Sequence, residues 1–337
     1  MNSKTSLLLL GAGIGAAFTL KKIVQSQRTI DLSGKVVLIT GGSRGLGLVL
    51  AREFAKLKAK IAICARDENG LERAKFDLLE HGANAFTFPC DVTDKVQVSN
   101  MIAAVHKKFG RIDVLINNAG IIQVTPMENA TEADFEEAFK THFWACFHTI
   151  NEVLPEMKTR KSGRIVNVSS IGGKVAFPHL LPYATSKFAL VGYSEGLRAE
   201  LLKDNIYVTT VCPGLMRTGS PRNAYFKGNQ KAEYAWFKMS DSLPFITISA
   251  ENAARQIIDA TRRGDAELII SLPAQLGAIV HGIFPALTAD ALGIVNQFLP
   301  APTDDTNRSK GKLHESPLTQ NVLTTLTDEA AAKNNQY

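Results

Sequence analysis

The 337-residue sequence has few cysteines and no strong excess of charge. Its four cysteines, Cys64, Cys90, Cys146 and Cys212, show no spacing typical of metal ligands, and they fall in or beside apolar segments. We therefore expect no metal site and no disulfide framework, and we interpret the cysteines as small core residues in a reducing compartment. The net charge is only +6, and the cationic residues are dispersed rather than interleaved with aromatic ones. Nucleic-acid binding is therefore not predicted.

Segments with strand-like and helix-like apolar patterns alternate through most of the chain. With 45% hydrophobic and 21% charged residues, the chain can bury a sizeable core. The alternation predicts an α/β fold, a Rossmann-like doubly wound parallel sheet of about seven strands with helices on both faces. Strands are expected near Val36, Ile61, Phe86, Val114, Ile165, Val208 and Leu268. We expect a single domain with terminal appendages.

The first predicted strand and the helix after it are joined by a glycine-rich turn, Thr40-Gly41-Gly42-Ser43-Arg44-Gly45-Leu46-Gly47. The strand pattern covers Lys35–Thr40, and Leu48–Leu57 has apolar residues at helical spacing. A turn of this kind places free backbone N–H groups at a helix N-terminus, where they bind a pyrophosphate. The alternative is that the glycines only let the strand and helix pack closely.

Three side chains in the middle of the chain form a candidate catalytic group, Ser170, Tyr183 and Lys187. Tyr183 and Lys187 are four residues apart, so on a helix they share one face. An ammonium group beside a phenol favours the phenolate, and we expect the pKa of Tyr183 to lie below its ordinary value of about 10. Tyr183 is therefore a candidate general acid or base near neutral pH.

Five motifs together resemble those of the short-chain dehydrogenase/reductases in order and spacing. They are the glycine turn, Asp91 in Cys90-Asp91-Val92-Thr93-Asp94, the run Asn117-Asn118-Ala119-Gly120, Ser170 with Tyr183-Ala184-Thr185-Ser186-Lys187, and Pro213-Gly214 followed by Thr218. The resemblance covers residues 32–272, most of the chain. It implies a Rossmann-like fold, an NAD(P)(H) cofactor and hydride transfer between the nicotinamide and a carbonyl or alcohol.

The resemblance also implies roles for residues of this chain. In the reduction direction, the substrate oxygen would lie between the Ser170 hydroxyl and the Tyr183 phenol, which donates the proton, while Lys187 would bind the nicotinamide ribose. The turn would hold the pyrophosphate, Asp91 would contact the adenine, and Thr218 would lie at the nicotinamide end. The implied cofactor contacts are Gly41, Ser43, Gly45, Leu46, Gly47, Asp91, Val92, Asn118, Ala119, Gly120, Tyr183, Lys187, Pro213, Gly214 and Thr218.

One position departs from the family pattern. Family members commonly have an asparagine on the helix after the Asn-Asn-Ala-Gly strand, where it supports a water in a proton relay to the lysine, and the matching residue here is His142. An imidazole also donates and accepts hydrogen bonds, so His142 is a candidate replacement. The alternative is a histidine that is merely satisfied between buried helices. This departure leaves a catalytically weak NADP-binding scaffold or sensor as the alternative function.

Cofactor preference depends on charge at the end of the second strand. An acidic residue there is typical of NAD enzymes, whereas an arginine accommodates the 2′-phosphate of NADP. This chain has Ala65 followed by Arg66, and Arg44 in the turn is a second guanidinium that could reach the same phosphate. The sequence therefore predicts a preference for NADP(H). NAD(H) is the alternative, because Asp67 lies next to Arg66.

Residues 219–248 correspond to the segment that covers the substrate in this family. The segment is rich in large apolar and aromatic side chains, Tyr225, Phe226, Tyr234, Trp236, Phe237, Met239 and Phe245. They suit a pocket for a small lipophilic carbonyl or alcohol, or they pack this lid onto the domain. We expect some of them to serve each purpose.

The two ends of the chain are expected to be appendages. Residues 5–20 carry no charge, and at about 1.5 Å per residue they span about 24 Å, less than the roughly 30 Å of a hydrocarbon core. We interpret them as a membrane anchor or membrane-surface helix, with a cleaved export signal and an ordinary packing helix as alternatives. Export would separate the enzyme from its nicotinamide pool, so the domain is expected to face the cytoplasm.

The expected division of the chain is an apolar N-terminal segment (1–31), an NADP-binding Rossmann-type oxidoreductase domain (32–272), an apolar helical extension (273–300) and a polar flexible tail (301–337) with a short helix near 328–333. The extension is compatible with covering the substrate cleft, with a subunit contact in a homo-oligomer or with dipping into a membrane.

Overall fold

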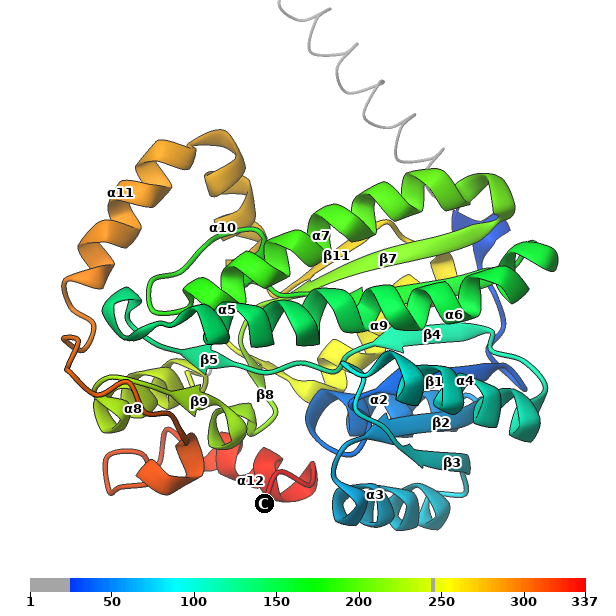
Figure 1. The fold of residues 1–337 in the computed structure, drawn as a ribbon, viewed down its shortest axis with the longest axis horizontal. Coiled ribbons are helices and arrows are strands. Elements are labelled where there is room, and N and C mark those ends of the chain that lie inside the picture. Colours follow the sequence, from blue (N-terminus) through cyan, green and yellow to red (C-terminus); the bar gives the residue numbers. More distant parts are fainter. Residues whose placement is uncertain (1–24, 244–245) are drawn as a thin grey trace, which may run out of the picture.

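Residues 25–243 and 246–337 are described by the computed structural model of the protein (Figure 1). Its central sheet has seven parallel strands in the order β11-β7-β6-β4-β1-β2-β3. They are β1 (Val36–Thr40), β2 (Lys60–Ala65), β3 (Asn84–Pro89), β4 (Val114–Asn117), β6 (Gly163–Val168), β7 (Ile206–Pro213) and β11 (Glu267–Ile270). Every predicted strand position falls within one of them. The chain runs outward from β1 to one edge and then returns to β4 and the other edge, which confirms the doubly wound fold class.

Helices cover both faces of this sheet because successive residues of each strand point to opposite faces. In β1, Val37 and Ile39 belong to one buried layer, and Val36 and Leu38 belong to the other. The first layer is completed by α2 (Gly45–Lys56), α3 (Glu68–Glu80) and α9 (Ala250–Arg263). The second is completed by α4 (Lys95–Phe109), α6 (Ala145–Thr159) and α7 (Leu181–Leu201). All four cysteines are buried.

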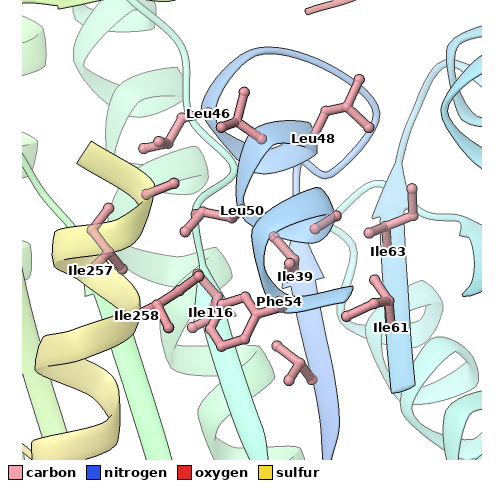
Figure 2. Packing of buried hydrophobic residues seen from close by; sticks show 14 of the residues in the cluster. Ile39, Leu46, Leu48, Leu50, Phe54, Ile61, Ile63, Ile116, Ile257 and Ile258 are labelled. Carbon is pink, nitrogen blue, oxygen red and sulfur yellow. The ribbon is translucent and has the colours of Figure 1, made fainter. Parts of the chain in front are cut away.

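The packing of α2 positions the glycine turn. Figure 2 shows Phe54 of α2 between the strands and α9, near Ile116, Ile257 and Ile258. Burying a side chain of this size contributes about 1.5–3 kcal/mol. The turn that joins β1 to α2 is therefore fixed at the carboxyl end of β1.

Short elements gather beyond the carboxyl ends of the central strands. A small three-stranded sheet has the order β12-β9-β5, and β8 pairs with β10. These elements are β5 (Gln123–Val124), β8 (Met216–Arg217), β9 (Tyr225–Phe226), β10 (Ile248–Ser249), β12 (Ser309–Lys310), α5 (Glu132–Phe139) and α8 (Gln230–Ser240). β8, β9, β10 and α8 all come from residues 216–249, here called the lid, which include the segment 219–248 that the sequence predicts over the substrate.

After β11 the chain forms two consecutive helices, α10 (Leu272–Ile283) and α11 (Pro285–Asn296), which project from the domain (Figure 1). Pro285 separates them by starting α11, where its missing N–H costs no helical hydrogen bond. The outward side chains of this α10–α11 hairpin are exposed and apolar, including Leu276, Ile283 and Leu287. Within the two described ranges, no helix is both long and apolar enough to cross a bilayer.

The structure differs from the flexible tail that the polar sequence of residues 301–337 predicts. Residues 309–337, here called the C-terminal strap, fold back onto the lid and the glycine turn and include β12 and α12 (Thr325–Lys333). Ala331 packs against Gly219, where an added Cβ would lie 2.4 Å from the Ala331 Cβ. The polar composition is misleading because hydroxyl groups are buried and hydrogen-bonded within the fold; the buried threonines are Thr319, Thr324 and Thr327.

Candidate active site

The carboxyl ends of the central strands meet a single cavity of about 640 Å³. Every residue that the sequence predicts for the site lies on its wall, with the exception of Gly47. Gly47 lies behind the turn, where an added Cβ would be only 2.2 Å from the Gly41 carbonyl oxygen. The glycine turn and the trio of Ser170, Tyr183 and Lys187 therefore border the same cavity.

The glycine turn is held in a conformation that suits a pyrophosphate. Gly41 and Gly45 have φ values of 65° and 56°, which L side chains rarely adopt. The Asn118 amide donates to the carbonyl oxygens of Thr40 (3.0 Å) and Gly41 (3.2 Å). The Thr40 hydroxyl accepts the N–H groups of Asn118 and Ala119, each at 3.0 Å. Glycines at the start of α2 leave the backbone N–H groups of the turn without side chains of their own over them, which suits the phosphates of a dinucleotide, although the Gly45 N–H is bonded to the Asn334 carbonyl and the Gln336 side chain lies against Gly45.

The trio comes from two neighbouring elements. Ser170 follows β6 and caps a short 3₁₀ helix, and its Oγ accepts the Gly172 N–H at 3.0 Å. Tyr183 and Lys187 both lie near the start of α7. The Lys187 ammonium donates to the Val168 carbonyl at 2.9 Å and lies 5.6 Å from the centroid of the Tyr183 ring.

The predicted lowering of the Tyr183 pKa is wrong for this structure. Burial raises the pKa of Tyr183 to about 12, and a hydrogen bond with Ser170 offsets this only in part. Burial also lowers the pKa of Lys187 from 10.5 to about 8. Desolvation of the phenol outweighs the nearby charge, because the ammonium is directed at the Val168 carbonyl. At neutral pH Tyr183 is therefore a protonated phenol, and Lys187 is mostly charged.

His142 lies in a π-helical segment between α5 and α6 and is only 1% exposed. Its Nδ1 is 2.7 Å from the Ser186 Oγ, and the Ser186 hydroxyl is donated to the Tyr183 carbonyl at 2.8 Å. Nδ1 therefore donates to Ser186, and Nε2 lies 3.1 Å from the Ile121 N–H and 3.0 Å from the Ile121 carbonyl oxygen; in the neutral ring Nε2 accepts the N–H. The imidazole thus has two polar partners that its sequence neighbours do not reveal.

The surroundings keep this imidazole neutral. Burial, together with the positive charge of Lys187, holds the pKa of His142 well below its usual range. The ring also meets the Tyr183 ring edge-on, with centroids 5.4 Å apart. His142 therefore supports the loop and helix that carry the trio, and as a neutral group it lacks the second, charge-giving proton at physiological pH.

Three charged residues occupy the part of the wall nearest the end of β2. The Arg44 guanidinium donates to the Asn223 side-chain oxygen at 3.0 Å. Arg66 lies 3.9 Å from an Asp91 carboxylate oxygen, and its side chain is 60% exposed. Asp91 itself accepts the backbone N–H of Thr93 at 2.9 Å. Both arginines line the cavity, and within the described part of the chain the contacts above use only some of their five donors each.

The aromatic side chains of the lid divide between two tasks, as the sequence predicts. Phe226 and Tyr234 are fully buried in a small core with Phe237. Tyr225, Trp236 and Phe237 line the cavity. Met239 is 41% exposed, and Phe245 lies outside the described residues.

The polar residues on the cavity wall that sequence reasoning missed include Asp241, Lys310 and Gln336. Asp241 ends α8, and burial raises the pKa of its carboxyl well above its ordinary value. Lys310 and Gln336 belong to the C-terminal strap. No local signal distinguishes them from residues of a solvated tail, because long-range packing alone brings the strap to the cavity.

Comparison with known proteins gives the same class as the fold and site. The family model described as short chain dehydrogenase matches residues 35–226. The chain is 34% identical over 264 residues to a dehydrogenase/reductase SDR family protein 7-like from Anopheles gambiae, which covers 76% of this chain and 81% of that protein. It is 33% identical over 221 residues to 17-beta-hydroxysteroid dehydrogenase 13 from Mus musculus, covering 64% of this chain and 73% of that one.

Solved structures of similar fold belong to the same class of enzymes. A variant of the actinorhodin polyketide ketoreductase with NADPH has a TM-score of 0.64 and 28% identity, covering 70% of this chain and 95% of that chain. A short-chain dehydrogenase from Streptomyces avermitilis has a TM-score of 0.69 and 28% identity, covering 80% of this chain and 99% of that chain. The chain belongs to the short-chain dehydrogenase family. It is an NAD(P)(H)-dependent oxidoreductase that transfers hydride between the nicotinamide and a carbonyl or alcohol substrate.

Proposed function

We propose that the protein is an NADP(H)-preferring reductase of lipophilic carbonyl compounds, in which Tyr183 acts as the general acid. The observation that carries this proposal is the single cavity that joins a phosphate-binding turn, the Ser170–Tyr183–Lys187 trio and an apolar lid. When bound, the nicotinamide supplies the hydride. Residues of this chain position the substrate and move the proton.

The protonation states favour the reduction direction at neutral pH. With a pKa of about 12, the Tyr183 phenol retains the proton that a carbonyl oxygen needs when it becomes an alcohol. The Ser170 hydroxyl would donate a second hydrogen bond to the same oxygen and stabilise its developing charge. Lys187 would keep a positive charge beside the phenol and bind the nicotinamide ribose, and His142 would position the start of α7 by its hydrogen bond to Ser186.

Preference for NADP(H) is supported by charge at the end of β2. Ala65 provides no carboxylate for a ribose hydroxyl, while Arg66 and Arg44 line the adjoining wall. A related ketoreductase was solved with NADPH. The preference predicts that this protein binds NADPH more tightly than NADH, by roughly tenfold or more, as charge-assisted hydrogen bonds to a phosphate allow.

A lipophilic substrate is supported by the lining of the lid. Apolar side chains face the cavity from the loop before α7 and from the lid, namely Phe177, Leu180, Trp236, Phe237, Leu243 and Ile246. Relatives include 17-beta-hydroxysteroid dehydrogenases and ketoacyl reductases, whose names describe carbonyl or alcohol groups on largely apolar molecules. The substrate class proposed here is therefore a ketone or aldehyde with an apolar body.

We further propose that the protein works at a membrane surface with its domain on the cytoplasmic side. Residues 5–20, which lie outside the described residues, are uncharged. The α10–α11 hairpin exposes large apolar side chains, and Asp290 is the only Asp, Glu, Lys or Arg between residues 271 and 303. Flotation with phospholipid vesicles tests this: the full chain should float, and Ile283→Glu should float less. Failure of the full chain to float, or equal flotation of the two proteins, would contradict the proposal.

The enzymatic proposal is tested by following NADPH oxidation with pooled lipophilic ketones and aldehydes. We expect turnover by the wild-type protein and at least about a hundredfold lower kcat for Tyr183→Phe, because general acid catalysis contributes about 10²–10⁴. Ser170→Ala should be impaired as well. NADPH binding without turnover would instead support the scaffold or sensor.

A further inference from the structure

The C-terminal strap forms part of the wall of the cofactor cavity, although the matched family model ends at residue 226. Its strand β12 pairs with β9, so that Lys310 lies opposite Tyr225. The Gly311 N–H donates to the Ala224 carbonyl at 3.0 Å. A Cβ added to Gly311 would lie 2.2 Å from the Pro221 carbonyl oxygen, so this stretch is seated closely. The backbone of Lys310 is therefore fixed beside the cavity.

The other end of the strap is fastened to the glycine turn. The Gly45 N–H donates to the Asn334 carbonyl at 2.8 Å, and the Asn335 amide donates to the Ser43 carbonyl at 2.7 Å. The Asn223 amide donates to the Gln336 side-chain oxygen at 2.8 Å, while its own oxygen accepts from Arg44. The strap thus occupies the Gly45 N–H, a group that without the strap would be available to an anion.

Three cations converge on this part of the wall, Arg44, Arg66 and Lys310. Among the residues that the structure describes, Arg44 and Lys310 have no carboxylate within ion-pair distance, and Arg66 has only a 3.9 Å approach to Asp91. Burial and the like charges of Arg44, Lys312 and Arg66 lower the pKa of Lys310, and the Asp67 carboxylate offsets this in part. Asp67 and Asp91 are near but not directly paired with Arg44 or Lys310, so the three cations still repel one another, and an anion that binds between them relieves the repulsion.

We propose that Lys310 is a cofactor-binding residue supplied by the C-terminal strap, and that it contacts the 2′-phosphate of NADP(H) together with Arg44 and Arg66. The inference rests on the NADP(H) preference proposed above. Arg66 stands at the end of β2, where the ribose 2′ position of a dinucleotide lies. The cofactor pyrophosphate is the other anion that Lys310 could meet, and it is common to NADP(H) and NAD(H).

Two small ligands separate these anions, because 2′,5′-ADP and 5′-AMP differ only in the 2′-phosphate. Their Kd values are measured by calorimetry for the full chain, for Lys310→Met, which keeps an aliphatic stem, and for Lys312→Met. Lys312 lies on the same strap and is exposed, but it does not line the cavity. We expect Lys310→Met to raise the Kd of 2′,5′-ADP about tenfold and that of 5′-AMP less than about twofold. Lys312→Met should change neither.

Two outcomes would overturn the inference. Equal weakening of both ligands by Lys310→Met would assign Lys310 to the phosphate that the cofactors share, and no weakening would remove it from the site. Arg66→Met is the positive control, because it should lose the discrimination between 2′,5′-ADP and 5′-AMP. If the wild-type chain itself fails to prefer 2′,5′-ADP, the NADP(H) proposal fails. If instead the wild-type chain prefers 2′,5′-ADP and Lys310→Met keeps that preference, only the role of Lys310 fails.

Discussion

The buried positive charge of Lys187 is expected to destabilise the folded protein. The residue is 5% exposed, and among the described residues its ammonium has one hydrogen bond, to the Val168 carbonyl. Replacing it with methionine keeps most of the volume of the side chain and removes the charge. The variant should lose activity and gain stability, as is common where a functional site contains a poorly solvated charge.

The magnitude follows from the pKa. A fall from 10.5 to about 8 corresponds to about 3 kcal/mol of unfavourable free energy in the folded protein. Loss of the hydrogen bond to Val168 costs about 1 kcal/mol. At pH 7, Lys187→Met should therefore be about 2 kcal/mol more stable than the wild-type protein.

The difference must also depend on pH. Below about pH 8 the folded wild-type protein carries the buried charge and its full cost. Between about pH 8 and 10.5 the folded state has released a proton that the unfolded state keeps, so wild-type stability rises relative to the variant. Above that window the advantage of the variant disappears.

Urea unfolding at pH 7 and at pH values up to the end of this window measures both effects. Lys203→Met, which removes an exposed lysine, is the matched control and should change stability by less than about 0.5 kcal/mol. A Lys187→Met variant that is less stable than wild type at pH 7, or a stability gap that is the same at every pH, would refute the reasoning.

Three further predictions concern other parts of the site. His142→Asn should keep activity within about tenfold and leave the pH profile between 6 and 8 unchanged, because the imidazole is already neutral; a profile that shifts would mean that His142 titrates during turnover. Asp241→Asn should be more stable than wild type at pH 7 and lose this advantage below pH 3.8, because the folded state raises the pKa of this carboxyl; thermal unfolding at both pH values tests the sign. Gly219→Ala should cost about 1–3 kcal/mol, since φ is 79° and its Cβ would meet Ala331, and limited proteolysis should then cut the strap first; unchanged cleavage would contradict the packing.

The sheet and the trio could be predicted because their signals are local. The seven strands are short apolar runs between helical segments, and Tyr183 and Lys187 share a helix face whatever surrounds them. The positive φ values at Gly41 and Gly45 likewise belong to the turn itself.

The remaining features depend on groups that are distant in the sequence. The pKa of Tyr183 is set by burial, and the two partners of His142 come from residues 121 and 186. Lys310 reaches the cavity only because β12 pairs with β9 and because Asn334 meets Gly45. A polar, threonine-rich segment is typical of a solvated tail, so composition could not reveal these contacts.

Transfer of deuterium tests the central claim most directly. NADPH that carries deuterium at both positions of nicotinamide C4 is incubated with the protein and a lipophilic ketone, and the alcohol is analysed by mass spectrometry. We predict one deuterium on the carbinol carbon of the product, with the hydroxyl proton coming from solvent, and no product from Tyr183→Phe above a residual rate. Product without deuterium, or equal product formation by Tyr183→Phe, would contradict hydride transfer with Tyr183 as the proton donor.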